Sequence, residues 1–464
     1  MTELQLDFDE TGNFLSRVED AQPGTDGGHP ELAELVERFA SLPTGPGSII
    51  VISLPNSIRT LRFFFAALLA GHTPALIAPS TPSYRVREVV RHVGAYALVR
   101  ARIGPGAYGE DARARLGGAD LAVFTHQPHK RYEPGHVILM TSGTSGFASG
   151  CLHSLDALLR NASRHVASIG QHGADTVLVN LPVYYSFALV AQVLGSMVAG
   201  SRLVVAGPPF SVTGYAATIA SRGVTVSSLT PVLAKAVAAT SDELPASLRT
   251  LTVGGQALDP GYVARLLKLN PAIGLFLTYG LTEAGPRVST LAAHQEPPHR
   301  YGSVGRPLDG VEVTFRDIGG GGDQEVLVRS DTVYRQRVGE HVASKRGTLL
   351  EADLVATGDI GFTDAAGYLT IRGRSSDFTV IHGEKVCLAS LRRAAESLPS
   401  VVRASAQVIA DDGDAAGLEL EIYVDDGSPL REVAVREQLR RMLVPSERPR
   451  RLRIHRLPVG ELHK

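Results

Sequence analysis

Val137-Ile-Leu-Met-Thr-Ser-Gly-Thr-Ser-Gly-Phe-Ala-Ser-Gly150 joins a short apolar run to a loop of glycines and hydroxyl side chains. The apolar run predicts a buried strand. A strand that ends in such a loop presents backbone N–H groups and hydroxyl donors to one point, where a polyphosphate commonly binds. The loop contains no lysine, so it is not the phosphate loop of kinases and GTPases, which requires one. Taken alone, the stretch also fits a flexible surface turn.

The size and composition of the chain indicate a protein of two or three domains. It has 464 residues, of which 44% are hydrophobic and 20% charged, and its formal net charge is −1. These values are typical of a soluble globular protein and give no general attraction to nucleic acid or anionic membrane. The first residues lack the pattern of a signal peptide, and no apolar run approaches the ~20 residues that cross a bilayer. We therefore expect a cytoplasmic protein with no membrane span and no nucleic-acid partner.

Short apolar strands alternate with helical patterns through most of the chain. The predicted strands lie at residues 48–54, 73–78, 95–101, 137–140, 176–181, 202–206, 224–229, 248–253 and 273–279. This alternation predicts an α/β fold with a large N-terminal domain of doubly wound, mostly parallel sheets. Ligands bind such sheets outside the carboxyl ends of the strands. The polar loops 141–150, 254–256 and 279–287 all follow predicted strands, so we expect them to converge on one ligand.

The pattern changes after Gly302. Short β-like runs at 311–315, 325–329 and 369–372 are separated by glycines and aspartates, with a glycine-rich hairpin end at 319–323. They predict a small β-rich subdomain near 302–374. A shorter mixed pattern of helices and strands follows. We therefore expect an N-terminal domain over residues 1–374 and a small α+β C-terminal domain over residues 375–464.

Three further motifs accompany the first loop in a fixed order. They are Tyr279-Gly-Leu-Thr-Glu283, Thr357-Gly-Asp359 and Gly367-Tyr-Leu-Thr-Ile-Arg-Gly-Arg374. In this order and at this spacing the set resembles the AMP-binding, adenylate-forming superfamily of acyl-CoA synthetases, peptide-synthetase adenylation domains and luciferases. The resemblance runs from about Ser48 to the C-terminus. It implies a large AMP-binding domain followed by a small, mobile lid domain that rotates between two half-reactions.

The resemblance implies a nucleotide site in the large domain. Its residues are Thr141, Ser142, Gly143, Thr144, Ser145, Gly146, Gly254, Gly255, Gln256, Tyr279, Gly280, Asp359 and Arg374. In that site Gly254, Gly255 and Gln256 would line the base pocket. Tyr279 would stack on adenine, Asp359 would accept both ribose hydroxyls, and Arg374 would hold ribose or phosphate oxygens. Taken singly, Asp359 also fits a turn residue, Arg374 a surface ion pair, and Glu283 of the second motif a charge at a helix N-terminus.

The resemblance also implies catalytic roles for Thr282, Glu283 and Lys464, with ATP and Mg²⁺ as cofactors. Thr282 would bond the α-phosphate, and Glu283 would supply the hard carboxylate oxygen that Mg²⁺ prefers. A carboxylate would attack the α-phosphorus of ATP, giving an acyl-adenylate and pyrophosphate. A thiol of CoA or of carrier-protein phosphopantetheine would then displace AMP. Positioning and charge neutralisation supply most of the acceleration in such a reaction.

The sequence departs from the family pattern in the phosphate loop and at the hinge. Ala148 and Ser149 replace a Pro-Lys pair, so a positive charge near the departing pyrophosphate is missing. Ser376 stands at a hinge position that is usually Asp or Lys.

The catalytic lysine depends on how the C-terminal motif is aligned. Counting from Pro458 places Lys464 at the position of the family lysine. Alignment on Gly460 instead places Glu461 there and leaves no lysine. We favour Lys464, because the spacing from proline to lysine is kept.

The acid pocket implied by the resemblance is aromatic. Its predicted residues are Tyr184, Tyr185, Ser186, Phe187, Gly285 and Arg287. The aromatic side chains suit an aryl or medium acyl acid, although they also fit ordinary core packing. Segment 181–200 has no acidic residue, and burying a substrate α-ammonium unpaired would be costly, so we disfavour an α-amino acid. Arg287 would pair with a second polar group of the substrate or with a surface carboxylate.

Three functions remain open at this point. The leading hypothesis is an ATP-dependent acid–thiol ligase resembling acyl-CoA synthetases, with a small carboxylic acid as substrate and an acyl or peptidyl carrier protein as a further partner. A second keeps the adenylate but uses a non-thiol acceptor or an unusual acid, as in an amide ligase or a nitrite-using diazotase. A third is a catalytically degenerate nucleotide-binding protein. The basic run 448–456 fits a solvated face or a docking site for CoA phosphates or an acidic carrier-protein helix.

Overall fold

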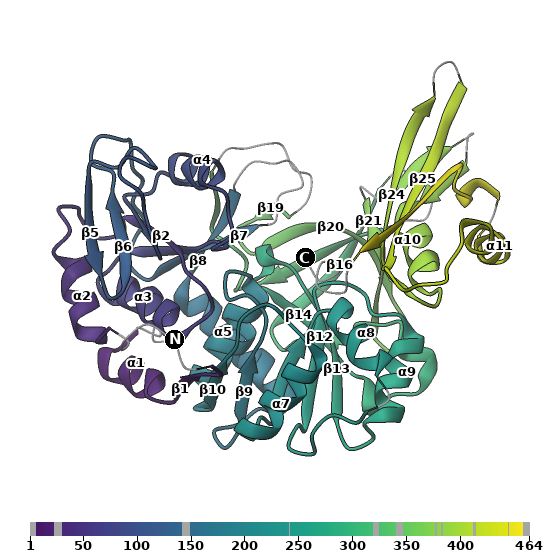
Figure 1. Ribbon diagram of the computed structural model, residues 1–464, viewed down its shortest axis with the longest axis horizontal. Helices are drawn as coiled ribbons and strands as arrows, with labels where there is room; N and C mark the ends of the chain where they lie inside the picture. The colour runs from purple at the N-terminus through teal and green to yellow at the C-terminus, as the bar shows by residue number, and fades with distance from the viewer. Residues whose placement is uncertain are drawn as a thin grey trace.

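Two eight-stranded sheets carry most of the chain in the computed structural model (Figure 1). The structure describes residues 6–22, 30–141, 149–240, 242–318, 324–339, 347–375, 378–381, 384–411, 414–443 and 445–457. Helices and strands alternate through both sheets, so the predicted α/β fold is confirmed. No helix in these ranges combines the length and the apolar character needed to cross a membrane.

The first sheet is mostly parallel. Its strands, in spatial order, are β1 (Val18–Asp20), β10 (Arg202–Val205), β9 (Thr176–Val179), β11 (Val226–Leu229), β12 (Thr250–Gly254), β13 (Gly274–Gly280), β14 (Arg287–Ala292) and β15 (Arg306–Pro307). The first six strands run parallel, and the last two add antiparallel pairs at the edge. Because β12 and β13 are parallel neighbours, the loops after them leave from the same edge of the sheet.

The second sheet has a parallel centre and antiparallel edges. Its strands, in spatial order, are β18 (Gln336–Gly339), β8 (Ser149–Ser154), β7 (His136–Thr141), β3 (Thr73–Leu76), β2 (Ile49–Ser53), β4 (Ala97–Arg100), β6 (Ala119–Val123) and β5 (Ala112–Leu116). Strands β7, β3, β2 and β4 are parallel. The apolar run at residues 137–140 therefore lies in strand β7, and Ser149 and Gly150 begin its antiparallel neighbour β8.

Helices pack against both sheets. They are α1 (Phe8–Leu15), α2 (Leu32–Ala40), α3 (Ile58–Leu69), α4 (Ser83–Val93), α5 (Leu155–Ile169), the π-helix η1 (Phe187–Leu194), α6 (Gly195–Ala199), α7 (Val212–Arg222), α8 (Pro231–Ala239) and α9 (Pro260–Leu269). Helix α3 carries three consecutive fully buried phenylalanines, as expected of a helix that is covered on most sides. Helix α5 starts where the Ser154 hydroxyl accepts the Ala157 N–H, and it ends at Gly170 in the left-handed conformation.

A third sheet contains β16 (Val311–Asp317), β17 (Gln324–Ser330), β20 (Leu354–Thr363), β19 (Thr348–Glu351) and β21 (Leu369–Arg374). It occupies the region where the sequence predicts a β-rich subdomain. Strand β18 lies within the same region of the sequence but pairs with β8 of the second sheet. Through this pairing, the segment that contains the third sheet is connected to β8, the strand that follows the predicted phosphate loop. The predicted hairpin end at 319–323 lies outside the described residues.

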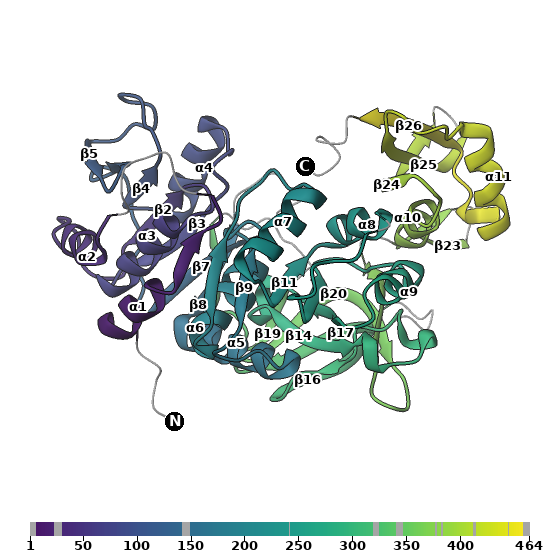
Figure 2. The ribbon, with the colours of Figure 1, turned by 60° about the horizontal axis from the view of Figure 1, so that its bottom comes forward.

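The C-terminal residues build separate sheets with their own apolar cluster. Their elements are β22 (Phe378–Ile381), β23 (Glu384–Cys387), α10 (Leu388–Glu396), β24 (Val401–Asp411), β25 (Asp414–Asp425), α11 (Glu432–Met442) and β26 (Arg451–Leu457). Figure 2 shows α10 beside α8, and Lys235 on α8 lies 3.3 Å from Glu396 on α10. We keep the division into domains 1–374 and 375–464 as a proposal that this separate cluster supports.

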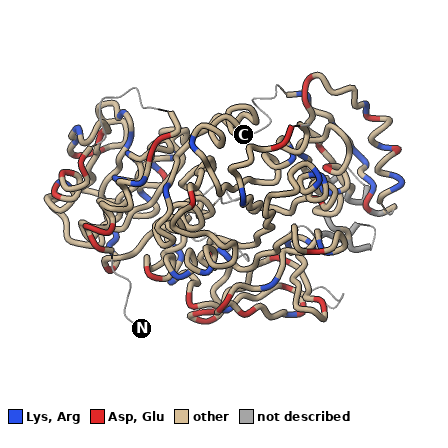
Figure 3. Tube along the Cα trace, turned by 90° about the horizontal axis from the view of Figure 1, so that it is seen from below, with Lys and Arg blue, Asp and Glu red and all other residues tan. Residues whose placement is uncertain are grey.

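Acidic and basic residues are interspersed along the trace (Figure 3). The basic run at 448–456 is largely on β26, where Arg453 lies 3.3 Å from Glu419 and 3.7 Å from Glu421. Arg456 donates to backbone carbonyls before α11. Neighbouring groups of the same chain therefore already contact much of this run.

Candidate active site

The edge of the first sheet brings two predicted loops together. Gly254 ends β12, and it pairs with Thr278, which precedes Tyr279 on β13. A Cβ at Gly254 would lie 2.3 Å from the Thr278 hydroxyl, so only glycine fits this close approach. Gly255 has a φ of 92°, and it is exposed together with Gln256. This exposed turn is compatible with the base-pocket role that we predict for it.

The predicted phosphate loop is described only at its ends. The Thr141 hydroxyl lies 3.0 Å from both the carbonyl and the hydroxyl oxygen of Ser149, which closes the base of the loop. Residues Ser142, Gly143, Thr144, Ser145 and Gly146 lie outside the described residues. Strand β7 nevertheless contacts the short turn Thr282–Ala284, so the start of the loop is next to the second predicted motif.

The turn Thr282–Ala284 is held from two sides. The Thr282 hydroxyl lies 3.0 Å from the Ser186 hydroxyl, and its carbonyl accepts from the His153 ring at 2.9 Å. The turn ends at Gly285, whose φ is 102° and where a Cβ would lie 2.6 Å from the Thr332 carbonyl oxygen. Glycine is required here by both conformation and space. The predicted catalytic threonine therefore has a fixed position.

Glu283 is buried and ion-paired. Its side chain is 6% exposed, and its Oε1 atom lies 2.8 Å from Nη2 of Arg337. Arg337 also donates to the Gly347 carbonyl at 3.2 Å. Arg337 is not among the residues predicted from the sequence, because its contact with Glu283 depends on the long-range pairing of β18 with β8. No local pattern in the sequence reveals that pairing.

A single carboxylate is sufficient for the predicted metal. Mg²⁺ in nucleotide sites is bound through one or two carboxylates, with substrate phosphates and waters completing its octahedron. The residues that the structure describes include no cluster of three or more His, Cys, Asp or Glu placed to hold a metal. Glu283 is a hard oxygen donor next to the end of β7, so the donor set fits Mg²⁺ delivered with ATP. The role of Glu283 as its ligand remains a prediction.

Three residues predicted to bind the nucleotide meet across two sheets. The Tyr279 hydroxyl donates to Oδ2 of Asp359 at 2.7 Å, and Nε of Arg374 lies 3.7 Å from Oδ1. Asp359 and Arg374 are paired across β20 and β21. Asp359 is buried, and its backbone N–H bonds to the Thr357 hydroxyl at 3.0 Å. The arrangement gives a fixed carboxylate beside an aromatic ring and a cation, as a ribose-binding role requires.

In the predicted acid pocket, the structure decides between the two roles that the sequence allows for Arg287. Arg287 is buried, which excludes its pairing with a surface carboxylate. The rings of Tyr184 and Tyr185 lie 4.7 Å apart, and 49% of Tyr185 is exposed, so Tyr185 is not a core residue. Phe187 begins the π-helix η1, an element that often occurs at functional sites.

Lys464 and Ser376 lie outside the described residues.

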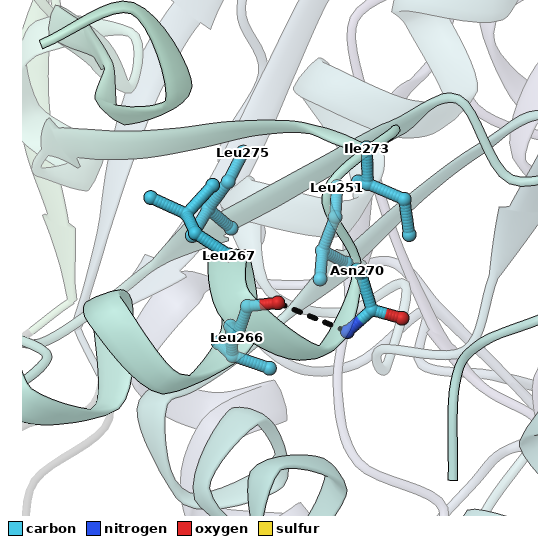
Figure 4. A pocket seen from close by; sticks show the side chains of 6 residues that line it. All are labelled: Leu251, Leu266, Leu267, Asn270, Ile273 and Leu275. Atoms are coloured by element: carbon cyan, nitrogen blue, oxygen red, sulfur yellow. Dashed lines mark hydrogen bonds between the residues drawn. The ribbon is translucent and has the colours of Figure 1, made fainter.

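An apolar cavity behind the first sheet is not part of this site. Figure 4 shows that its lining is mostly aliphatic and lies between α9 and strands β12 and β13. Its polar member, Asn270, donates to the Leu266 carbonyl at 3.0 Å and accepts from the Leu244 N–H at 2.8 Å. With these bonds made, the cavity is a packing gap in the core.

Two buried histidines next to the site predict a dependence of stability on pH. Burial lowers the pKa of His153 to about 4, although its bond to Thr282 opposes this shift. Burial and then the charge of Arg287 hold the pKa of His165 well below its usual range. Between pH 6.5 and 4 the unfolded chain binds a proton at His153 that the folded chain does not, so stability falls as the pH falls. We expect His153 to account for a loss of ~3 kcal/mol over this interval.

Urea unfolding between pH 4 and 7 tests this expectation. His153→Gln keeps a side-chain N–H for the Thr282 carbonyl but removes the titration. The variant should show a slope of stability against pH that is smaller by about one proton. An unchanged slope would assign the pH dependence to other groups.

Comparisons with known proteins identify the family of the chain. A family model described as AMP-binding enzyme matches residues 28–336. The salicyl-AMP ligase / salicyl-S-ArCP synthetase of Mycobacterium tuberculosis is 27% identical over 439 residues, covering 84% of this chain and 75% of that protein. The sulfoacetate–CoA ligase of Cupriavidus necator is 25% identical over 461 residues, covering 92% of this chain and 87% of that protein.

Solved structures share the fold. The o-succinylbenzoate coenzyme A synthetase of Bacillus subtilis, in complex with ATP and magnesium ion, superposes with a TM-score of 0.76 at 19% identity, covering 93% of this chain and 91% of that one. The amide bond synthetase of Marinactinospora thermotolerans also gives a TM-score of 0.76, at 21% identity, covering 98% and 97%. The first contains the two cofactors predicted from the sequence. The predicted resemblance is thus confirmed: the chain belongs to the AMP-binding family of adenylate-forming enzymes and is an AMP-forming ligase of the acyl-CoA synthetase type.

Proposed function

We propose that the protein activates a small carboxylic acid with ATP and transfers the acyl group to a thiol of CoA or of a carrier-protein phosphopantetheine. Two features carry this proposal. Asp359 accepts a hydrogen bond from Tyr279 and forms an ion pair with Arg374, and the Thr282–Glu283 turn has a fixed position. These groups match the needs of ribose, of the α-phosphate and of a metal-bound polyphosphate. Since ATP and CoA are cytoplasmic metabolites, we place the reaction in the cytoplasm.

Each residue has a defined task in this proposal. Asp359 accepts the ribose hydroxyls, and Arg374 holds ribose or phosphate oxygens beside it. The paired hydroxyls of Ser186 and Thr282 face the α-phosphate, where Thr282 donates a hydrogen bond. Glu283 holds Mg²⁺, which supplies charge neutralisation at the phosphates when it is bound. The preformed contacts mean that little reorganisation is needed when charge develops.

The acid that we propose is an aryl or medium acyl acid. Tyr184, Tyr185 and Phe187 offer an aromatic surface beside Ser186. The buried cation of Arg287 lies against Phe187 and would repel the α-ammonium of an amino acid. The curated relatives named above act on aryl and small acids, which supports the same class.

Asp359→Ala should weaken ATP binding by ~2–4 kcal/mol, because two ribose hydroxyls lose a charged acceptor. Tyr279→Phe, which removes only the hydroxyl bonded to Asp359, should cost ~1 kcal/mol. Calorimetry with ATP and 2′-deoxy-ATP measures both effects. If the wild type bound the two nucleotides equally well, the ribose role of Asp359 would be wrong.

A screen of pyrophosphate release tests the function itself. Aryl, medium acyl and small acids are each incubated with Mg²⁺ and ATP, with and without CoA. We expect release that depends on the acid, and thioester formation when CoA or a carrier protein is present. Adenylate formation without thioester would favour a non-thiol acceptor such as an amine. Pyrophosphate release in the presence of nitrite would favour an unusual acid as the substrate. Nucleotide binding without release for any acid would favour a degenerate protein.

A further inference from the structure

Arg287 differs from the other buried charged residues that the structure describes. Each of the others forms an ion pair with an oppositely charged side chain: Asp175, Lys235, Glu283, Glu325, Asp359 and Glu419. Arg287 is 3% exposed and has no such partner in the described part of the chain. Burying an unpaired charge costs several kcal/mol, so this position requires an explanation.

One edge of the Arg287 guanidinium is unused. Its Nη1 atom donates to the Thr278 hydroxyl at 2.8 Å, and its Cζ atom lies 3.7 Å from the centre of the Phe187 ring. Its Nε and Nη2 atoms are buried without a hydrogen-bond partner. These two nitrogens share one side of the planar guanidinium. That side is the edge on which a carboxylate binds with both oxygens.

The position of Arg287 is fixed by its backbone. The buried side chain of Asn161 accepts from the Arg287 N–H at 2.9 Å and donates to its carbonyl at 3.0 Å. Across the sheet, Arg287 pairs with Gly280. The glycine at position 254 leaves the space taken by the Thr278 hydroxyl and the Phe187 ring, which a Cβ would meet at 2.3 and 3.1 Å. The unused donor edge is therefore preorganised.

The same contacts connect Arg287 to the adenylation centre. Phe187, which covers the guanidinium, directly follows Ser186, whose hydroxyl lies 3.0 Å from that of Thr282. Arg287 therefore contacts the predicted acid pocket at Phe187, next to the hydroxyl pair of Ser186 and Thr282. Phe187 is partly exposed, whereas the guanidinium whose face it covers is buried.

We propose that the acid activated by this protein carries a second carboxylate, which Nε and Nη2 of Arg287 bind side-on. This proposal rests on the proposed acid activation and narrows its substrate class to diacids. A carboxylate supplies the missing opposite charge and two acceptors for the two unused donors. The aromatic, water-poor surroundings strengthen that bond relative to one at the surface. A monoacid of the same shape, with an uncharged group in place of the second carboxylate, leaves the charge of Arg287 unpaired.

Matched acid pairs test the proposal by acid-dependent pyrophosphate release. Benzoate is compared with benzene-1,3-dicarboxylate, and pentanoate with glutarate. We expect the wild type to favour a diacid over its matched monoacid by ~30-fold in kcat/KM. Arg287→Met should lose this preference, and Arg287→Lys should recover part of it. Arg441→Met, at an exposed position on α11, is the control and should behave like the wild type.

Thermal unfolding gives a readout that does not depend on turnover. Arg287→Met should raise Tm by a few degrees, because it removes an unpaired buried charge. The diacid should raise the Tm of the wild type but not that of Arg287→Met. If diacids stabilise only the wild type but no acid releases pyrophosphate, the diacid site holds and acid activation fails. If acids are activated with no diacid preference, or Arg287→Met keeps that preference, the diacid proposal is overturned and the activation stands.

Discussion

Glu283→Gln is expected to lower acid-dependent pyrophosphate release at least ~100-fold while ATP binding stays measurable. The amide has nearly the same shape as the carboxylate but lacks the negative charge that we propose holds Mg²⁺. A neutral amide oxygen is a weaker ligand for this cation, so less of the charge that develops on the polyphosphate is neutralised. Pyrophosphate release at saturating acid measures the chemical step. Calorimetric titration with ATP measures binding separately.

The ion pair at this position provides a matched control. Arg337→Gln breaks the same 2.8 Å contact but keeps the Glu283 carboxylate. We expect this variant to retain pyrophosphate release within ~10-fold of the wild type, since only the neighbour of the metal ligand is lost. Equal losses in the two variants would mean that the ion pair matters and not the metal-binding carboxylate. Activity near that of the wild type in Glu283→Gln would rule out the proposed role altogether.

The parts of the site that could be predicted are those with local sequence signals. Apolar runs followed by polar loops identified the strands β7, β12 and β13, and the order of the motifs identified Asp359. The structure places the Tyr279 hydroxyl 2.7 Å from Asp359, although 80 positions separate them in the sequence. The family resemblance of the motif set predicts that Tyr279 and Asp359 lie in one site. The periodicity of the sequence around either residue does not predict their contact.

The parts that were missed depend on long-range pairing or on turn chemistry. Arg337 reaches Glu283 only because β18 leaves its neighbours in sequence and pairs with β8. The edge strand β1 is three residues long, too short for a pattern, yet it extends the first sheet beside β10. The hairpin of β5 and β6 turns at Gly117 and Gly118, which both have positive φ. Two adjacent glycines are a hairpin signal that the sequence does contain.

Lys464→Ala is expected to slow adenylate formation ~100-fold or more while sparing transfer from a pre-formed acyl-adenylate. If the spacing from Pro458 is the meaningful one, the Lys464 ammonium reaches between the carboxylate and the α-phosphate when adenylation begins. There it offsets the growing charge on the bridging oxygens, a contribution of ~3–4 kcal/mol for one well-placed donor. The family resemblance implies that the lid domain has rotated before transfer, so this charge is not needed in the second step.

Two rates measured separately decide the role of Lys464. Acid-dependent pyrophosphate release reports the first step, and thioester formation from a synthetic adenylate reports the second. Glu461→Ala and His463→Ala are the matched controls, because they alter the same segment without removing the ammonium. If Glu461→Ala slows the first step and Lys464→Ala does not, the alignment on Gly460 is the correct one. If neither substitution changes either rate, the protein neutralises the charge of its first step with other groups, and Arg374, beside the proposed ribose carboxylate, is the next residue to substitute.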